Sequence, residues 1–244
     1  MTEPVATVRV APELRFLLAP RHRLGEVHVP LDGTSSLGHV VESVGVPRTE
    51  VGVLLVAGAE VGPAYRPRDR DVVDVLPVVR PQPVPAHRYL LDVHLGALAR
   101  RMRLVGLDTA YRNDADDAEL VEEAAHERRV LLTRDRGLLR RRALTSGAYV
   151  RGELADAQLA DVLDRFAPDL APWTRCLACN GVLVPVGVEE VAHLLEPGTL
   201  RTYTDFSRCP RCGRAYWRGA HARRLGAVVE TALASPRVRT PGRR

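Results

Sequence analysis

The sequence predicts a multidomain protein of mixed α/β and α+β class, and three observations support this prediction. Residues 1–80 alternate short apolar strand patterns with one amphipathic helix pattern. From residue 88 onward strand and helix patterns alternate, which is typical of a parallel sheet covered by helices. Two CxxC motifs follow in a cysteine-bearing segment. The length of 244 residues is enough for two or three small domains.

The N-terminal 80 residues are predicted to form a strand-rich domain with one helix at residues 37–44, capped by Ser35 or Ser36. The segment "VVRPQPVPAH" then places three prolines in alternation. Because proline removes backbone donors and stiffens the chain, residues 81–87 are predicted to form an extended linker. The expected strands are 7–10, 26–29, 51–56 and 72–76.

The second domain is predicted at residues 88–170, and a cysteine-bearing ribbon at 171–225. Residues 226–244 are expected to form a helix remnant and a disordered basic tail. The expected elements of the second domain are strand 89–91, helix 95–105, helix 117–127, strand 130–133, helix 136–144, strand 148–150 and helix 156–166.

Composition limits the chemistry and the partners. All 35 basic residues are arginine, which excludes Schiff-base and P-loop chemistry because both need lysine. The net charge of +5 suits an anionic partner such as nucleic acid. No stretch approaches the roughly 20 apolar residues that span a bilayer. The start "MTEPVATVRV" lacks a signal-peptide pattern, so we expect a cytoplasmic protein without membrane contact.

The four cysteines form the motifs "CLAC" and "CPRC". Two CxxC motifs in one chain are typical of a tetrahedral structural zinc site. Disulfides are disfavoured in the cytoplasm, and a redox CxxC does not come as a matched pair. We therefore predict a structural zinc ion held by Cys176, Cys179, Cys209 and Cys212.

Three aspartates are predicted to converge on the carboxyl edge of the parallel sheet. Asp92 and Asp135 each follow a strand pattern, and Asp117 begins the apolar face of a helix pattern. Converging carboxylates repel unless a cation lies among them, and oxygen ligands select Mg²⁺ or Mn²⁺. The alternatives are that Asp117 and Asp135 only cap helices and that Asp92 holds a turn.

Arginines near these acids are candidates for binding a nucleic-acid backbone, because the arginine fork matches phosphate geometry, and the motif "YWRGAH" adds further candidates. The alternative is that several of them form a solvated helix face. Trp217 is a further candidate, or it packs within the ribbon. The candidate nucleic-acid-binding residues are Arg100, Arg101, Arg134, Arg136, Arg218 and His221.

The segment "LLDVHLGALARRMRLVGLDTAYRNDADDAELVEEAAHERRVLLTRDRGLL" resembles the mut-seven C-terminal RNase domain, a PIN-like nuclease fold. "CLACNGVL" and "CPRCGRAYWRGAH" resemble the zinc-ribbon half of that family. The resemblance implies that Asp92, Asp117 and Asp135 are the family's acids. PIN nucleases commonly carry a further acid on an early helix, and the predicted helix 95–105 has none. Asp114, Asp116 and Glu119 are candidate substitutes, and Asp117 is preferred over Asp116 on helix phase and spacing.

Residues 5–79 resemble the ubiquitin-like β-grasp domain that precedes this RNase in bacterial proteins, which is similar to sulfur carriers. The Gly-Gly terminus of carriers is missing, so carrier chemistry is not expected. The resemblance implies a metal-dependent ribonuclease with RNA as substrate and a protein partner for the ubiquitin-like domain. The alternative is a non-catalytic RNA-binding or ribosome-associated adaptor with a degenerate nuclease site.

Overall fold

The computed structural model describes residues 3–237, except for the side chains of residues 220–224. The chain divides into two compact units. The first unit contains Met1–Val79 together with Asp135–Tyr149, and the second contains Arg80–Arg134 and Val150–Arg244. A segment that the sequence places inside the second domain therefore belongs to the first unit.

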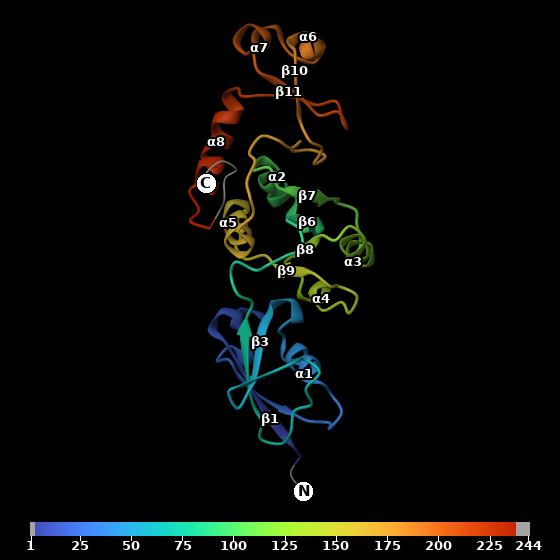
Figure 1. The fold of residues 1–244 in the computed structure, drawn as a ribbon, viewed down its shortest axis with the longest axis vertical. Coiled ribbons are helices and arrows are strands. Elements are labelled where there is room, and N and C mark those ends of the chain that lie inside the picture. The colour runs from blue at the N-terminus through green and yellow to red at the C-terminus, as the bar shows by residue number, and fades with distance from the viewer. Residues whose placement is uncertain (1–2, 238–244) are drawn as a thin grey trace. The chain divides into compact units, whose positions relative to one another are not determined.

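The first unit is built on a five-stranded sheet of order β2-β1-β5-β3-β4, of which Figure 1 labels β1 and β3. Strand β1 pairs in parallel with β5, which the strand patterns alone did not reveal, and the other neighbours pair antiparallel. This is the predicted β-grasp arrangement, because the first and last strands lie side by side at its centre. The strands are β1 (Val5–Val10), β2 (Glu26–Pro30), β3 (Val51–Val56), β4 (Ala59–Val61) and β5 (Val72–Pro77).

Helix α1 (Leu37–Val44) covers this sheet and has the predicted bounds. Ser36 is its N-cap, because the Ser36 hydroxyl accepts a hydrogen bond from His39 N over 3.4 Å. The apolar side chains of α1 join a buried cluster with those of the strands, including Val8 and Val73, both 0% exposed. Three short 3-10 helices complete this part of the unit, namely η1 (Pro12–Leu17), η2 (Pro20–His22) and η3 (Arg48–Glu50).

The first unit also contains helix α4 (Arg136–Leu139) and strand β9 (Gly147–Tyr149). The prediction of a helix over residues 136–144 was wrong, because α4 ends after one turn. The amides that follow bond back three residues rather than four, Arg140 to Gly137 and Arg141 to Leu138. Residues 141–143 are exposed, so no apolar stripe holds a longer helix in place.

The second unit contains the parallel sheet that the strand–helix alternation predicted. Within this unit the strand order is β7-β6-β8, and β6 pairs in parallel with both neighbours. Tyr89, Leu90 and Leu91 of β6 are all 0% exposed, as expected for a strand covered on both faces. Strand β7 was not predicted, because its polar residues Asp108 and Thr109 interrupt the apolar pattern. The strands are β6 (Arg88–Leu91), β7 (Asp108–Tyr111) and β8 (Val130–Thr133).

The helices of this sheet domain lie close to the predicted positions. Each of the three α-helices carries an apolar stripe, which in α5 contains Leu159, Val162, Leu163 and Phe166. They are η4 (Val93–Leu95), α2 (Gly96–Leu104), α3 (Asp117–His126) and α5 (Ala155–Phe166).

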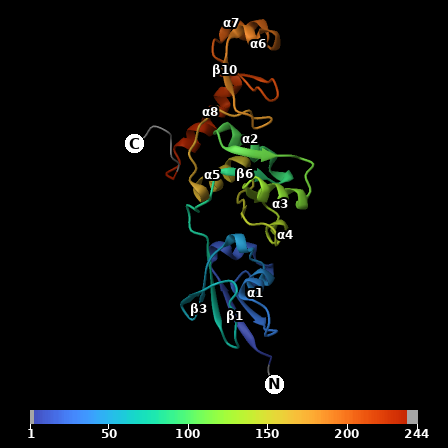
Figure 2. The ribbon, with the colours of Figure 1, turned by 45° about the vertical axis from the view of Figure 1, so that its right-hand side comes forward.

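The cysteine-bearing segment folds around a three-stranded antiparallel sheet of order β10-β11-β12. Helix α8 (Ala220–Leu233) follows and lies beside α5 in Figures 1 and 2. It starts within the segment predicted as ribbon, and residues 238–244 of the predicted tail lie outside the described residues. The remaining elements are β10 (Val184–Val186), α6 (Val188–Val191), η5 (Ala192–Leu194), α7 (Pro197–Thr202), β11 (Phe206–Arg208) and β12 (Ala215–Trp217).

The proline-rich stretch is anchored to helix α5 of the second unit. Arg80 Nη1 lies 2.7 Å from Asp161 Oδ1 and 2.9 Å from Asp164 Oδ2. Burial lowers the pKa of Arg80, but the two carboxylates outweigh this effect and raise the pKa, so the guanidinium stays charged. Gln82 N donates to the carbonyl of Arg165 over 2.6 Å, and Arg165 Nε donates to Gln82 Oε1 over 2.8 Å. These residues are therefore part of the packed second unit.

Within the described part of the chain, no helix combines the length and the apolar composition that a bilayer span needs.

The anchor of the proline-rich stretch gives a testable prediction. Arg80→Ala should lower the free energy of unfolding by about 1–3 kcal/mol, because the half-buried Asp161 loses a charged hydrogen-bond donor. Arg201→Ala, which removes an exposed arginine from α7, is the matched control. Urea unfolding followed by circular dichroism measures both variants, and equal stability of the two would contradict the anchor.

Candidate acidic strand edge and four-cysteine centre

Asp92 is a buried carboxylate at the carboxyl edge of the parallel sheet. It directly follows β6 and is 6% exposed. Its main-chain N–H donates to the carbonyl of Leu132 in β8 over 3.0 Å. Its Oδ2 accepts a hydrogen bond from the hydroxyl of Thr133, the last residue of β8, over 2.6 Å. Since ligands of parallel sheets bind at this edge, Asp92 lies where the sequence predicted a site.

Asp92 is also the N-cap residue of η4, but its side chain makes no cap hydrogen bond. Its carboxylate is instead directed to Thr133. A role in the turn therefore explains the main-chain conformation of Asp92. It does not explain why the carboxylate is buried.

The structure separates Asp116 from Asp117 by their local roles. Asp116 is exposed and caps α3, because its Oδ1 accepts from the amides of Ala118 and Glu119 over 2.8 and 2.9 Å. Glu119 Oε2 accepts in return from the amide of Asp116 over 3.2 Å, which completes a capping box. Asp117 is the first residue of α3 and is half-buried. The cap role thus belongs to Asp116 and not to Asp117, and the choice of Asp117 as the metal ligand stays a prediction.

Asp135 lies in the first unit and is the N-cap of α4. Its Oδ1 accepts from the amide of Gly137 over 2.6 Å and from that of Leu138 over 3.4 Å. The alternative role as a helix cap is therefore present in the structure. A cap uses one carboxylate oxygen, so it does not by itself exclude a second role for the other.

Within residues 3–237, one group of His, Cys, Asp or Glu side chains brings its ligand atoms within 4.8 Å of one another. This group is the four predicted cysteines. The carboxylates of Asp92, Asp117 and Asp135 do not form such a group in that part of the chain, so the three-aspartate site stays a prediction.

The candidate nucleic-acid-binding arginines are mostly engaged within the protein. Arg101 Nε lies 2.6 Å from Asp156 Oδ1, and Arg134 Nη2 lies 2.7 Å from Glu153 Oε1. Arg218 stacks on the ring of Trp173, with its Cζ 5.8 Å from the ring centroid.

Three further candidates complete this set. Arg136 Nη1 donates to the carbonyl of Leu17 over 2.7 Å. Arg100 is exposed, and the side chain of His221 lies outside the described residues. Trp217 is 37% exposed.

The four cysteine sulfurs converge as a tetrahedral metal site requires. Cys176 Sγ lies 3.6 Å from Cys212 Sγ, and Cys179 Sγ lies 3.4 Å from Cys209 Sγ. A zinc ion with Zn–S bonds of about 2.3 Å places its sulfurs about 3.8 Å apart, so the spacing fits. All four cysteines are free of disulfides.

Each CxxC motif forms a tight loop. Asn180 and Gly213 follow the motifs with φ angles of 66° and 76°, which only glycine and asparagine adopt readily. These turns let the amide of Asn180 donate to the carbonyl of Cys176 over 3.0 Å, and the amide of Gly213 to that of Cys209 over 2.8 Å. These turn residues therefore shape the loops that present the sulfurs.

Hydrogen bonds distinguish the cysteines from one another. Burial alone would raise the pKa of Cys176, but donation by the Tyr216 hydroxyl and by the amides of Cys179 and Ala178 lowers it to about 6. The Tyr216 oxygen lies 3.0 Å from Cys176 Sγ. Burial raises the pKa of Cys179 to about 12, and neighbouring sulfurs add to the effect. One thiolate thus forms readily, whereas four adjacent thiolates need a cation.

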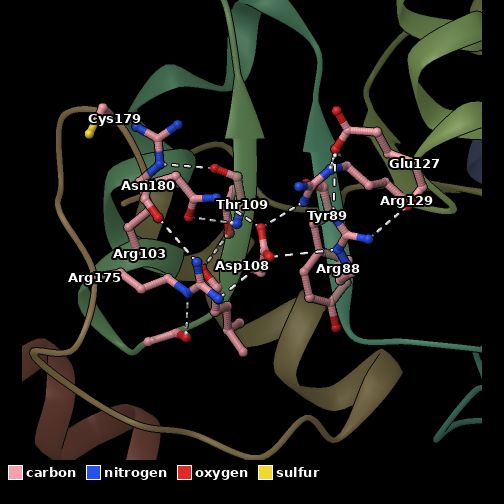
Figure 3. Close-up of polar contacts among 12 residues, drawn as sticks. Arg88, Tyr89, Arg103, Asp108, Thr109, Glu127, Arg129, Arg175, Cys179 and Asn180 are labelled. Atoms are coloured by element: carbon pink, nitrogen blue, oxygen red, sulfur yellow. Dashed lines mark hydrogen bonds and ion pairs between the residues drawn. The ribbon is translucent and has the colours of Figure 1, made fainter. Parts of the chain in front are cut away.

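A polar network at the amino edge of the parallel sheet joins β7 to the first CxxC loop (Figure 3). Thr109 N donates to Asn180 Oδ1 over 2.9 Å, and Asn180 Nδ2 donates to Asp108 Oδ1 over 2.8 Å. The buried Arg103 of α2 donates from Nη1 to the carbonyls of Leu177 and Ala178 over 3.1 and 2.9 Å. The sheet and the cysteine loop therefore share one hydrogen-bonded framework.

Asp108 is the centre of this network. Arg129 Nη1 lies 2.7 Å from Asp108 Oδ1, while Arg175 Nη2 and Arg88 Nε lie 3.4 and 3.6 Å from Asp108 Oδ2. Burial alone would raise the pKa of Asp108, but hydrogen bonds from Arg129 and Asn180 and the nearby arginine charges lower it. No sequence pattern indicated these residues, because Asp108 starts a strand whose polar residues interrupt the apolar pattern.

These features define a class of protein: a parallel α/β domain with a buried acid at the carboxyl edge of its sheet, followed by a four-cysteine ribbon. Residues 87–229 match the Mut7-C RNAse domain, and residues 3–83 match the Mut7-C ubiquitin domain. The first match covers more than half of the chain, so the chain belongs to the Mut7-C RNAse domain family. It carries a Mut7-C RNAse domain preceded by a ubiquitin-like domain, as the sequence resemblance implied.

No curated protein matches the chain. A solved structure, "Crystal structure of SAMP1 from Haloferax volcanii", aligns with 34% of this chain and 98% of its own at 12% identity and a TM-score of 0.24. This TM-score is too low to support a conclusion.

The cysteine geometry predicts one zinc ion per chain. Structural zinc contributes folding free energy directly, so Cys176→Ser should lower zinc content and destabilise the cysteine-bearing segment. Thr202→Ser, a mild change in the nearby helix α7, is the control. Elemental analysis and thermal unfolding with and without a chelator measure the effect. A wild-type protein that is folded without zinc and insensitive to the chelator would contradict the site.

The Asp108 network predicts a pH-dependent contribution to stability. The folded-state pKa of Asp108 lies below its unfolded value of about 3.9, so its stabilisation is present above that value and is lost as pH falls through the folded pKa. Asp108→Asn should therefore lower the free energy of unfolding at pH 7 by about 1–3 kcal/mol. The difference between the variant and the wild type should shrink below about pH 4. Urea unfolding at both pH values measures this difference, and a constant difference would contradict the role of the charge.

Proposed function

We propose that this protein is a metal-dependent ribonuclease of the cytoplasm that hydrolyses RNA phosphodiester bonds. Membership of the Mut7-C RNAse domain family supports the reaction class. The single observation that carries the proposal is Asp92, a buried carboxylate at the carboxyl edge of the sheet. A carboxylate in this position is costly to bury unless it has a partner, and a bound cation is a strong one.

The proposed metal ligands are Asp92, Asp117 and Asp135. Their carboxylate oxygens are hard donors, which suit Mg²⁺ or Mn²⁺ better than zinc. When bound, such an ion lowers the pKa of water and stabilises negative charge on a phosphate. The Thr133 hydroxyl holds Oδ2 of Asp92, so the orientation of this carboxylate is fixed before any ligand arrives.

Two groups of residues are proposed to contact RNA, namely exposed residues and arginines that pair with a surface carboxylate. Arg100 is exposed, and Trp217 offers a partly exposed ring for stacking. Arg101 and Arg134 pair with exposed carboxylates of Asp156 and Glu153, and such surface pairs are weak enough to exchange for a phosphate. The four-cysteine centre has no open position in this proposal, so its zinc is structural and takes no part in the reaction.

The aspartates give the decisive prediction. Asp92→Asn, Asp117→Asn and Asp135→Asn should each lower Mn²⁺-dependent RNA cleavage by roughly 100-fold or more, because each removes a charged metal ligand. Asparagine still accepts from the Thr133 hydroxyl and still caps a helix, so the fold should survive. Cleavage of a labelled mixed RNA substrate with and without Mn²⁺ measures the loss, and RNA binding is measured in parallel.

Two control variants distinguish the loss of a metal ligand from the loss of a helix cap or of a surface charge. Asp116→Asn retains the α3 cap and should keep full activity. Asp205→Asn removes an exposed carboxylate from the same unit and should also be active. Full cleavage by Asp135→Asn would return this residue to the helix-cap role alone. RNA binding without cleavage in the wild type would instead support the non-catalytic adaptor, for which the absence of an acid from α2 is the favouring observation.

A further inference from the structure

The segment Asp135–Tyr149 is held by the ubiquitin-like part of the first unit through contacts that no sequence pattern indicated. Helix α4 has only one turn, which is too short to be stable by itself. Leu138 and Leu139 are nevertheless buried, at 0% and 2% exposed. The segment therefore depends on its surroundings for its conformation.

Two arginines of this segment bind a pair of main-chain carbonyls, Leu17 O and Gly45 O, which we name the carbonyl pair. Arg136 Nη1 donates to Leu17 O over 2.7 Å, and Arg140 Nη2 donates to Gly45 O over 2.9 Å. The two arginines are four residues apart, a spacing that places side chains on one face of a helical turn.

The carbonyl pair is suited to bind cations. Leu17 is the last residue of η1, and Gly45 is the C-cap of α1. Carbonyls at helix ends lack intrahelical partners, and the helix dipole makes the end of α1 partly negative. A Cβ placed on Gly45 would lie 2.9 Å from Leu17 O, so these two chain segments are in close contact. The left-handed φ of 125° at Gly45 also favours glycine.

A buried carboxylate holds the other end of the segment. Glu50 is 1% exposed, and its Oε1 accepts a hydrogen bond from the amide of Tyr149 over 2.8 Å. The ring of Tyr149 packs on that of Phe16, with 5.2 Å between centroids. The segment is thus fixed at both its start and its end by residues that precede Val79.

We propose that the ubiquitin-like domain acts as an intramolecular clamp on residues 135–149, and that its carbonyl pair and Glu50 position the loop that carries Asp135. Arg136 then serves the clamp, in place of the RNA-binding role that the sequence suggested. The effect on catalysis rests on the proposed ribonuclease function, whereas the clamp itself does not. Arg136, Arg140 and Glu50 are positioning residues in this scheme, since they act through the segment.

The test compares Arg140→Ala with Arg142→Ala in the full-length protein. Both remove one arginine charge from the same exposed stretch, but only Arg140 binds the carbonyl pair. Hydrogen exchange measured by mass spectrometry should show about tenfold faster exchange of the amides in residues 135–149 for Arg140→Ala, because a charged hydrogen bond is lost. Arg142→Ala should exchange as the wild type does.

Activity provides the second measurement. With Mn²⁺ and RNA, Arg140→Ala should lower the single-turnover cleavage rate by roughly tenfold, because a misplaced loop lowers the rate of the chemical step. Its RNA affinity should equal that of Arg142→Ala, since the two lose the same charge. Arg136→Ala should repeat both effects of Arg140→Ala.

The clamp is overturned if residues 135–149 exchange in Arg140→Ala and Arg136→Ala at the wild-type rate. It is also overturned if Arg142→Ala accelerates this exchange as much as Arg140→Ala does. If both arginine variants weaken RNA binding and leave exchange unchanged, these arginines contact RNA and the clamp is wrong. If the wild type cleaves no RNA while exchange responds as expected, the proposed function fails and the clamp stands.

Discussion

The second unit depends on the ion pairs and hydrogen bonds of one carboxylate, that of Asp108. It lies at the start of β7, partly buried, with the guanidinium of Arg129 and the amide of Asn180 on the same oxygen. Arg129 also donates to Glu127, and Asn180 belongs to the turn that shapes the first cysteine loop. One carboxylate therefore holds together the parallel sheet and the cysteine-bearing segment. A neutral residue at this position would leave the positive charges of Arg88, Arg129 and Arg175 less compensated, which is costly for the buried Arg129.

The acids at the two edges of the parallel sheet have different partners. At the amino edge Asp108 is surrounded by cations and Asn180, so its carboxylate has little capacity left for a ligand. At the carboxyl edge Asp92 has a neutral partner, the Thr133 hydroxyl. A hydroxyl donates a hydrogen bond without bringing a positive charge to the carboxylate. The structural centre and the proposed catalytic edge are thus separated by the length of the strands.

Arginine performs many of the structural roles in this lysine-free chain. Arg103 donates to the carbonyls of a cysteine loop, and Arg140 donates to a carbonyl at a helix end. A guanidinium suits these roles because its planar fork offers five donors in fixed directions. Several arginines of this chain are thus engaged with acceptors inside the protein.

The sequence alone determined the domain types, most element positions and the four-cysteine cluster, because these depend on local patterns. Paired CxxC motifs and the strand 130–133 are such patterns. The structure decided which of two adjacent acids, Asp116 or Asp117, caps α3, through local hydrogen bonds from Ala118 and Glu119 that the sequence does not assign to either acid. It also decided the length of α4 and the roles of Asp108 and Arg140. The hydrogen-bond partners of Asp108 and Arg140 lie far away in the sequence, so no local pattern indicates these bonds.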